Sequence, residues 1–213
     1  MGVLGLPFLL MPARYASKLG SLWGHCVHLC LSTIPIGFSF KGDIAKSDQV
    51  IYAVKHQSAW ETLILYWQFD SPIVVLKKEL LSIPLFGWYL RKIGSISINR
   101  DKITKDNLGF FEDVLEIISN SNRPLIIFPQ ARRVLPTERP SFKKGVAKIY
   151  DKLSIKCQPL AINSGFVWPK KGKKESNKKI TVSILEPISP GLSKEDFVMK
   201  LENKIYSELD KIN

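Results

Sequence analysis

The alternation of two kinds of segment constrains the fold of this chain more than any other feature. From residue 41 onward, short runs rich in β-branched residues are separated by longer amphipathic stretches. The short runs predict strands at residues 49–54, 73–76, 95–98, 125–128, 159–162 and 180–185. The amphipathic stretches predict helices at residues 62–69, 78–93 with a break at Pro84, 104–120, 142–153 and 194–212. Strands and helices that alternate in this way are typical of an α/β domain.

The length and composition of the chain allow such a domain to fold without disulfides. The chain has 213 residues, of which 45% are hydrophobic, so we expect one domain, or one domain with an appendage. A chain of this size buries roughly 70% of its unfolded surface, which excludes disordered, collagen-like and disulfide-framework classes. Three cysteines, Cys26, Cys30 and Cys157, form no CxxC pair. We interpret them as thiols in a reducing compartment.

The first 40 residues form a second, distinct region. Residues 1–13 and 19–40 contain no Asp, Glu, Lys or Arg. The first stretch is shorter than the about 20 apolar residues that a spanning helix needs, and Gly, Pro and polar residues interrupt the second. We expect residues 1–40 to form a pair of helices in the membrane interface, with Trp23, Arg14 and Lys18 near the headgroups. The alternative is a helical subdomain packed on the domain formed by residues 41–213.

Four residues of this apolar region, His25, Cys26, His28 and Cys30, are of the types that bind zinc. They lie within a few positions of one another, but no carboxylate accompanies them. We therefore interpret them as half-buried structural residues, and we expect no metal.

The charge of the chain predicts a polyanionic partner. Lys and Arg number 31 against 19 Asp and Glu, which gives a formal net charge of +12. Nucleic acid, an anionic membrane or a phosphorylated substrate would each match this charge. The Lys-rich residues 169–179 lie between two predicted strands and are interpreted as a solvated hairpin tip, which would also suit anionic headgroups. Most aromatic residues sit inside apolar runs rather than among Lys and Arg, which disfavours nucleic acid.

Polar residues follow three of the predicted strands directly. They occupy residues 55–61, 99–101 and 129–133. In open α/β sheets the ligand crevice lies outside the carboxyl ends of the strands. We therefore expect these three segments to converge on one site.

His56 is the leading candidate for a general base. It is the only histidine outside the first 40 residues, and it lies where a strand gives way to a helix. An imidazole can take a proton from an alcohol near neutral pH, and it needs an acceptor on its other nitrogen. Glu61 is the nearest carboxylate in the sequence. The alternative is structural, because Ser58-x-x-Glu61 is also a capping box, whose Glu accepts a backbone N–H.

Two arginines follow predicted strands and are candidates for anion binding. Arg100 and Arg133 each come after an apolar run. Two guanidinium groups that meet at one site can clamp a phosphate bidentately. The alternative is that each is a solvated strand end.

Taken in order, these segments resemble the four motifs of the glycerolipid acyltransferases. Residues 55–61 resemble His-x-x-x-x-Asp, with Glu61 in place of the usual Asp. Residues 75–80, 83–88 and 94–100 look like the second block, and residues 127–133 are similar to the third, ordinarily Phe-Pro-Glu-Gly-Thr-Arg. Residues 158–162 resemble the fourth, a strand that contains a proline. The resemblance covers about residues 50–187.

The set of motifs implies a 1-acylglycerol-3-phosphate acyltransferase of the bacterial type, with a mixed central sheet flanked by helices. By resemblance, His56 deprotonates the free hydroxyl of lysophosphatidate and Glu61 orients its ring. The phosphate is held by cations, Lys77, Arg100, Arg132 and Arg133. Acyl-CoA or acyl carrier protein is the co-substrate, no cofactor or metal is needed, and the expected location is the cytoplasmic face of the bacterial inner membrane.

The third motif departs from the family pattern. Gln130, Ala131 and Arg132 stand where the family has Glu-Gly-Thr, so a carboxylate is lost, a Cβ is added and a cation is gained. Because glycine takes positive φ at little cost, Ala131 is expected to strain the turn that presents Arg133. Two alternatives follow: an acyltransferase for another lysolipid or for glycerol-3-phosphate, or a degenerate, non-catalytic basic protein of the membrane surface.

Overall fold

A seven-stranded mixed sheet forms the centre of the molecule. The computed structural model describes residues 5–45, 49–69, 71–98 and 108–212. The strands are β1 (Gly37–Lys41), β2 (Ile51–Val54), β3 (Ile73–Lys77), β4 (Ile96–Ile98), β5 (Leu125–Ile127), β6 (Cys157–Ile162) and β7 (Lys179–Ile184), in the order β1-β7-β6-β2-β5-β3-β4. Among these strands, β6 and β7 pair antiparallel and every other neighbouring pair is parallel.

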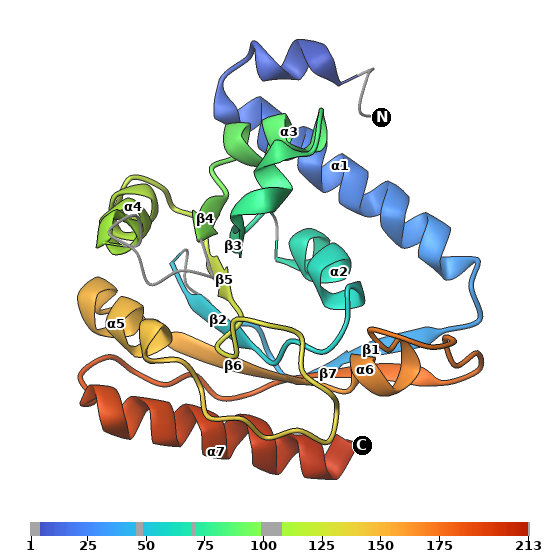
Figure 1. Cartoon of the computed structure of the whole chain (residues 1–213), viewed down its shortest axis with the longest axis vertical. Helices are drawn as coiled ribbons and strands as arrows, with labels where there is room; N and C mark the ends of the chain where they lie inside the picture. Colours follow the sequence, from blue (N-terminus) through green and yellow to red (C-terminus); the bar gives the residue numbers. More distant parts are fainter. Residues whose placement is uncertain (1–4, 46–48, 70, 99–107, 213) are drawn as a thin grey trace.

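Helices cover both faces of the sheet (Figure 1). On one face lie α4 (Leu108–Ser119), α5 (Lys144–Leu153) and α7 (Lys194–Ile212), and on the other lie α1 (Ala13–Ser32), α2 (Trp60–Gln68) and α3 (Phe86–Lys92). Alternation along β2 divides the core accordingly. Ile51 and Ala53 join the cluster under α5 and α7, whereas Tyr52 and Val54 join the cluster under α2. Continued by two residues, this alternation directs Lys55 and His56 to opposite faces.

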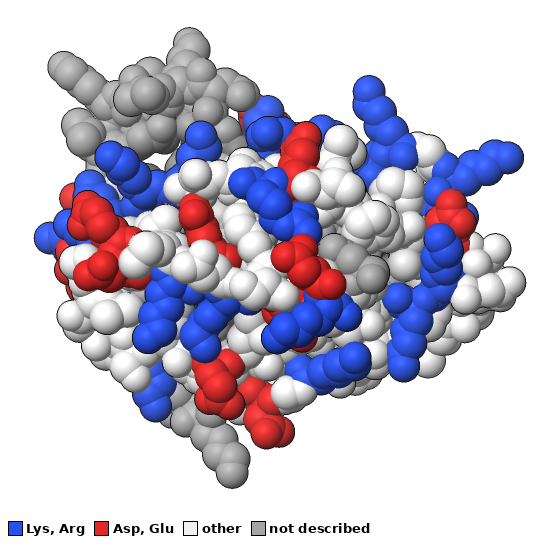
Figure 2. All heavy atoms as spheres, turned by 90° about the horizontal axis from the view of Figure 1, so that it is seen from below, with Lys and Arg blue, Asp and Glu red and all other residues white. Residues whose placement is uncertain are grey.

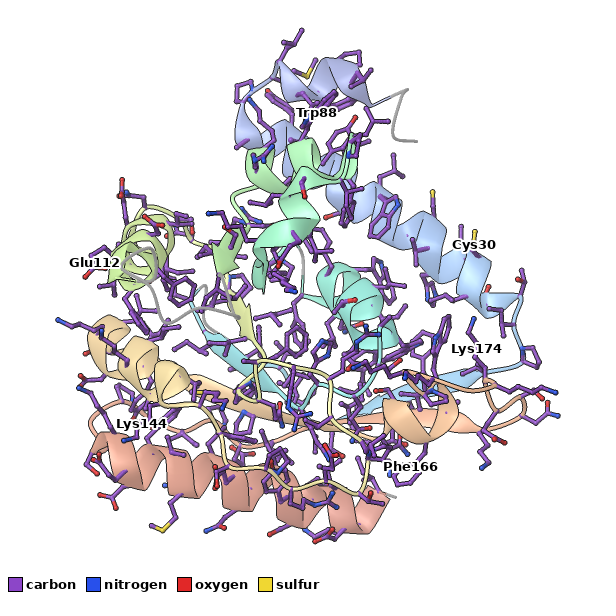
Figure 3. All side chains as sticks on the ribbon, viewed as in Figure 1. Cys30, Trp88, Glu112, Lys144, Phe166 and Lys174 are labelled. Carbon is purple, nitrogen blue, oxygen red and sulfur yellow. The ribbon has the colours of Figure 1, made fainter. Side chains whose placement is uncertain are left out.

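The N-terminal region is helical and packs on α2. A short 3-10 turn, η1 (Leu6–Leu9), precedes α1. Gly20 and Gly24 let α1 approach closely, because a Cβ on either would come within 3.0 Å of Tyr66 or Trp67. The other side of α1 is exposed, and Cys30 points away from the sheet (Figure 3). Among the described residues, no helix has both the length and the apolar character needed to cross a bilayer.

One strand lies inside the region expected to be helical. β1 begins at Gly37 and pairs in parallel with β7 from Gly37↔Lys179 to Lys41↔Ser183. The expectation of helix is therefore wrong for residues 37–40. Phe38 and Phe40 pack against the cluster under α2, as the period-2 spacing of a strand requires. The uncharged character of these residues reflects an edge strand that lies on the core.

Most other predicted elements are confirmed within a few residues. The helix predicted at residues 78–93 is divided by Pro84 into η2 (Lys78–Ser82) and α3. A four-residue helix after β6, α6 (Ser164–Val167), was not predicted. The Lys-rich residues 169–179 connect α6 to β7, between antiparallel strands as expected, and Lys174 lies over the ring of Trp168 at 3.6 Å.

The face covered by α7 carries charges of both signs. Figure 2 views the molecule from this side and shows Lys and Arg interspersed with Asp and Glu. Several of these charges pair, including Arg139 with Asp210 at 2.9 Å and Lys211 with Glu208 at 3.3 Å. An electropositive surface for a polyanion would need one sign of charge. The α7 face is therefore a solvated outer surface.

Candidate active site

The end of β2 brings His56 and Glu61 into contact. His56 lies two residues beyond the strand, and Glu61 lies in the first turn of α2. His56 Nδ1 is 3.0 Å from Glu61 Oε1. Glu61 is fully buried, and His56 is 8% exposed. A spacing of five would not place the two on one helix face, but His56 precedes the helix and the chain folds it back toward the carboxylate.

The Glu61 carboxylate is held by four hydrogen bonds. Its Oε1 accepts from His56 and from the backbone N–H groups of Gln57 and Ser58, at 2.6 and 2.7 Å for the two amides. Its Oε2 accepts from the Ser164 hydroxyl at 2.8 Å. The capping contact and the imidazole contact, which were alternatives in the sequence, are thus made by the same oxygen atom.

These contacts assign the protons of the imidazole. Glu61 Oε1 accepts two backbone N–H groups, so the carboxylate acts as an acceptor at this atom. The ring nitrogen that faces it, Nδ1 of His56, must therefore donate. Nε2 is then the basic nitrogen in the neutral ring. This is the tautomer that a general base needs when its other nitrogen is oriented by a carboxylate.

The third motif supports His56 from the neighbouring strand, β5. The imidazole stacks on Phe128, with ring centroids 4.1 Å apart and planes at 25°. Gln130 Oε1 accepts the His56 N–H at 3.3 Å, and the Val134 N–H donates to the His56 carbonyl at 2.9 Å. Gln130 therefore stabilises the backbone of the first motif, although Glu is the usual residue at its position in the family pattern.

Ala131 has a backbone conformation that favours glycine. Its φ angle is +57°, in the left-handed region that L-residues adopt at a cost of roughly 1–2 kcal/mol. The expectation of positive φ at this position is confirmed. The turn nevertheless forms, with the Ala131 N–H donating to the Phe128 carbonyl at 2.9 Å.

An apolar cavity of about 610 Å³ opens beside His56. It lies between α1, α2, β3 and the η2–α3 segment, and its lining is mainly aliphatic and aromatic. Residues that line it include Leu19, Trp23, Leu63, Tyr66, Leu76, Leu80, Phe86, Tyr89 and Phe128. Three of the predicted site residues, His56, Lys77 and Arg133, also line this cavity. The site thus combines a base, two cations and a volume suited to a hydrocarbon chain.

The predicted cations differ in their positions. Lys77 ends β3, lies 3.0 Å from Glu79 and lines the cavity, as does the half-buried Arg133. Arg132 does not line the cavity; its side chain is 67% exposed, and its guanidinium is 4.0 Å from Glu138. The structure therefore places Arg132 outside the cavity that Lys77 and Arg133 line, and its part in a phosphate clamp stays a prediction. Arg100 lies outside the described residues.

Lys55 is a buried charge to which the sequence pattern assigned no role of its own. It is fully buried, and its ammonium donates to the carbonyls of Pro136 and Glu138 at 2.9 and 3.1 Å. Burial, and then the positive charge of Arg139, lowers the pKa of Lys55 to about 8. Its place directly after a fully buried strand was the signal that could have identified it. Lys55 fixes the segment that follows Arg133.

The apolar N-terminal histidines make ring contacts. His25 Nε2 accepts from the Trp67 indole at 3.0 Å, and the His28 ring stacks on Trp67 with centroids 4.5 Å apart. In the part of the chain that the structure describes, no three His, Cys, Asp or Glu residues gather as metal ligands. These histidines connect α1 to α2.

The chain is similar in sequence to known acyltransferases. A family model described as acyltransferase matches residues 36–163. The chain is 31% identical over 170 residues to a 1-acyl-sn-glycerol-3-phosphate acyltransferase from Pseudomonas aeruginosa, which covers 78% of this chain. It is 29% identical over 161 residues to a protein of the same name from Helicobacter pylori, which covers 74% of this chain. The chain spans 65% and 67% of the lengths of these two relatives.

A solved structure has the same fold. The crystal structure of the 1-acyl-sn-glycerophosphate (LPA) acyltransferase PlsC from Thermotoga maritima aligns with a TM-score of 0.78. The alignment covers 100% of this chain and 89% of that chain, at 18% sequence identity. The mixed sheet flanked by helices is therefore confirmed.

Proposed function

Because the chain belongs to the acyltransferase family, we propose that it transfers an acyl group from acyl-CoA or acyl carrier protein to the free hydroxyl of lysophosphatidate. The observation that carries the proposal is the His56–Glu61 pair at the wall of an apolar cavity that Lys77 and Arg133 also line. Two relatives that bear the name of this activity support the choice of acceptor.

The geometry supports a direct transfer. His56 Nε2 takes the proton of the acceptor hydroxyl, while Glu61 stabilises the imidazolium through Nδ1. The hydroxyl oxygen attacks the thioester carbon, so a C–O bond forms and the C–S bond breaks. The proton then passes from the imidazolium to the leaving thiolate. Lys77 and Arg133 are the cations that would hold the phosphate of the acceptor.

The cavity supports a lipid substrate. A drug-sized ligand is buried by a pocket of roughly 300–1,000 Å³, and this cavity of about 610 Å³ is lined mainly by apolar side chains. Acyl chains gain free energy from such burial at roughly 0.8 kcal/mol per CH₂ group. We propose that the cavity receives one acyl chain with its reacting end at His56.

An acyl-transfer assay tests the activity. Purified protein is incubated with radiolabelled acyl-CoA or acyl carrier protein and with lysophosphatidate, glycerol-3-phosphate or lysophosphatidylcholine, and the lipids are separated by chromatography. We expect labelled phosphatidate from lysophosphatidate. Phosphatidate offered as acceptor is the control, because it has no free hydroxyl. Faster labelling of glycerol-3-phosphate or of lysophosphatidylcholine would identify that compound as the preferred acceptor. Labelling of none of the three would contradict the activity.

We also propose that the face around α1 and α3 binds an anionic membrane. Large apolar side chains are exposed there and contact solvent, namely Leu10, Leu22, Leu29, Ile83, Phe86 and Trp88. Interfacial helices bury such side chains among the headgroups, and basic residues add electrostatic attraction. The net charge of +12 matches that requirement. The same face borders the cavity, so a lipid could enter it without crossing water.

Sedimentation with phosphatidylglycerol vesicles tests the membrane face. We expect Leu22→Glu with Leu29→Glu to lower the bound fraction, and 1 M salt to lower it only in part, since screening acts on charges and not on buried apolar surface. Leu135→Glu is the matched control, because Leu135 is 59% exposed but lies in the loop after β5. Equal binding of the double variant and the control would contradict the proposal.

A further inference from the structure

The second carboxylate oxygen of Glu61 has its own buried donor. Ser164 is fully buried, and its Oγ lies 2.8 Å from Glu61 Oε2. We propose that Ser164 is a positioning residue, which fixes the Glu61 carboxylate so that Oε1 faces the imidazole of His56. The inference rests on the proposed acyl transfer, in which this imidazole is the base. The chain therefore contains a relay of three buried groups, Ser164, Glu61 and His56.

The division of contacts explains why a second donor is needed. Oε1 accepts three hydrogen bonds, from His56 Nδ1 and from the amides of Gln57 and Ser58. A carboxylate rotates easily about its last bond, because that torsion is broad and roughly two-fold. A half-turn would restore an equivalent carboxylate, but any smaller rotation would tilt the carboxylate plane and move the accepting oxygen away from the ring. A hydroxyl on Oε2 opposes this rotation and also lowers the cost of burying the charge.

Ser164 is itself held rigidly relative to the first motif. It begins α6 and directly follows Asn163, the first residue after β6. The next residue, Gly165, donates its N–H to Gln57 Oε1 at 2.8 Å. A Cβ at Gly165 would come within 2.9 Å of both Pro136 and Gln57, so only glycine lets the two segments approach this closely.

The Asn163 side chain fixes the other side of this turn. Its Nδ2 donates to the Ile212 carbonyl at 2.9 Å, and its Oδ1 accepts the Thr181 N–H at 2.8 Å. The turn is thus tied to α7 and β7 as well as to the first motif. A serine in this position has little freedom to follow a carboxylate that moves, and can direct it instead.

The inference also accounts for the length of the carboxylate side chain. Glu61 replaces the Asp that the family pattern has, and its extra methylene lets one carboxylate reach both the His56 ring and Ser164. Asp at the same helix position would withdraw the carboxylate toward the α2 backbone. We therefore expect Glu61→Asp to lose one of these two contacts.

A double-mutant cycle tests the relay. We expect Ser164→Ala to lower kcat about tenfold with KM for the acceptor unchanged, since about 1.4 kcal/mol of transition-state stabilisation corresponds to a tenfold change in rate. In the Glu61→Gln background, Ser164→Ala should lower kcat less than about twofold, because residues that act through one another are not additive. The matched control is Ser183→Ala, which removes a buried serine that donates to Glu208 at 2.9 Å; its kcat should equal that of the wild type.

A second readout does not depend on turnover. His56 Nδ1 donates its proton in a hydrogen bond to Glu61, and we expect a downfield proton NMR resonance that is absent in His56→Ala. We expect this resonance to shift or broaden in Ser164→Ala and to remain unchanged in Ser183→Ala. The circular dichroism spectra of the wild type and of these two variants should be the same. Ser164→Cys, which keeps a weak donor, should lie between wild type and Ser164→Ala.

The outcomes separate this inference from the proposed function. An inactive wild-type protein whose resonance responds to Ser164→Ala would contradict the acyl transfer but support the positioning of the carboxylate. An active wild-type protein whose kcat and resonance are unaffected by Ser164→Ala would overturn the inference. If Ser164→Ala lowered kcat by the same factor in the wild type and in Glu61→Gln, the inference would be overturned as well. Ser164 would then act independently of the carboxylate.

Discussion

The two sides of the candidate site differ in how firmly they are held. On the side of β2, His56 is 8% exposed, and the fully buried Glu61 carboxylate accepts four hydrogen bonds. On the side of the cations, the Lys77 side chain is 43% exposed and Arg133 is half-buried. The first side is a fixed, buried network; the second is a set of long side chains in contact with solvent.

The difference matches the chemistry expected of each side. Proton transfer requires the base within hydrogen-bond reach of the hydroxyl, and it tolerates little displacement. A phosphate can be held by long-range attraction to cations, which depends weakly on their geometry. Variants of the buried side should therefore change kcat, and variants of the exposed side should change KM for the acceptor.

Removal of the base should have the largest effect. We expect His56→Ala to lower kcat by about 10³-fold, within the 10²–10⁴-fold range of a general base. Its circular dichroism and its binding of lysophosphatidate should match the wild type. Steady-state kinetics at saturating acceptor measures the effect; a loss of less than tenfold would show that another group accepts the proton.

The Glu61 charge should have the next largest effect. Glu61→Gln keeps an oxygen that can accept the Gln57 and Ser58 amides but removes the charge that stabilises an imidazolium. We expect kcat to fall roughly 10²-fold, at the lower end of the contribution of a positioned base. The change in the free energy of unfolding, measured by thermal denaturation, should be smaller than the loss of transition-state stabilisation that this fall in kcat represents. Near-normal kcat in this variant would mean that Glu61 acts as a helix cap alone.

The two arginines of the third motif should separate clearly. Arg133 lines the cavity, whereas Arg132 does not. We expect Arg133→Ala to raise KM for lysophosphatidate about tenfold, the loss of one charge-assisted contact of about 1.4 kcal/mol, with a smaller change in kcat. Arg132→Ala is the matched control and should change KM less than twofold. A larger effect from Arg132→Ala would reverse the assignment.

Replacement of Ala131 should stabilise the protein modestly. Glycine relieves the positive φ of +57° but costs some unfolded-state entropy. The balance is about 0.5–1 kcal/mol of added stability, or a rise in Tm of about 1–4 °C for a chain of this size. Ala147→Gly, in the buried face of α5, is the control and should lower Tm. An unchanged or lower Tm in Ala131→Gly would indicate that the alanine side chain makes compensating contacts.

Lys55 follows β2 directly and binds the segment that follows Arg133, and replacing it should have an effect that depends on pH. Its pKa is lowered from 10.5 to about 8 by burial and by Arg139. Between these values the unfolded chain keeps a proton that the native protein has lost, so this group adds stability as pH rises through the window. We expect the Tm difference, wild type minus Lys55→Met, to become more positive between pH 8 and 10.5 and to be constant below pH 8. A flat or falling difference would contradict the shifted pKa.

The fold could be predicted where local signals were strong. The predicted bounds of α7, residues 194–212, agree with the structure because apolar residues recur every four positions on its buried face, namely Phe197, Leu201, Ile205 and Leu209. Its start is set by Ser193, which exchanges hydrogen bonds with the backbone and side chain of Asp196. β1 was missed because the alternation of Phe38 and Phe40 lies at the end of an uncharged run.

The site could be predicted in part, for a related reason. The pairing of His56 with Glu61 follows from a motif within one stretch of chain, and the structure brings them together. Ser164 lies 103 residues from Glu61 and carries no local signal, since only the pairing of β6 with β2 brings them into contact. The direction of the Arg132 side chain follows from the backbone of one turn, in which Ala131 has positive φ. No sequence pattern specifies that direction.

The central claim is that His56, oriented by Glu61, takes the proton from the acceptor. The most direct test compares the pKa in the pH profile of kcat/KM, which reports the free enzyme, with the pKa of His56 titrated by NMR and assigned with His56→Ala. The account predicts that the two values agree and that activity appears as the imidazole loses its proton. A kinetic pKa that differs from that of His56 by more than one unit, or a profile that rises as His56 gains a proton, would contradict it.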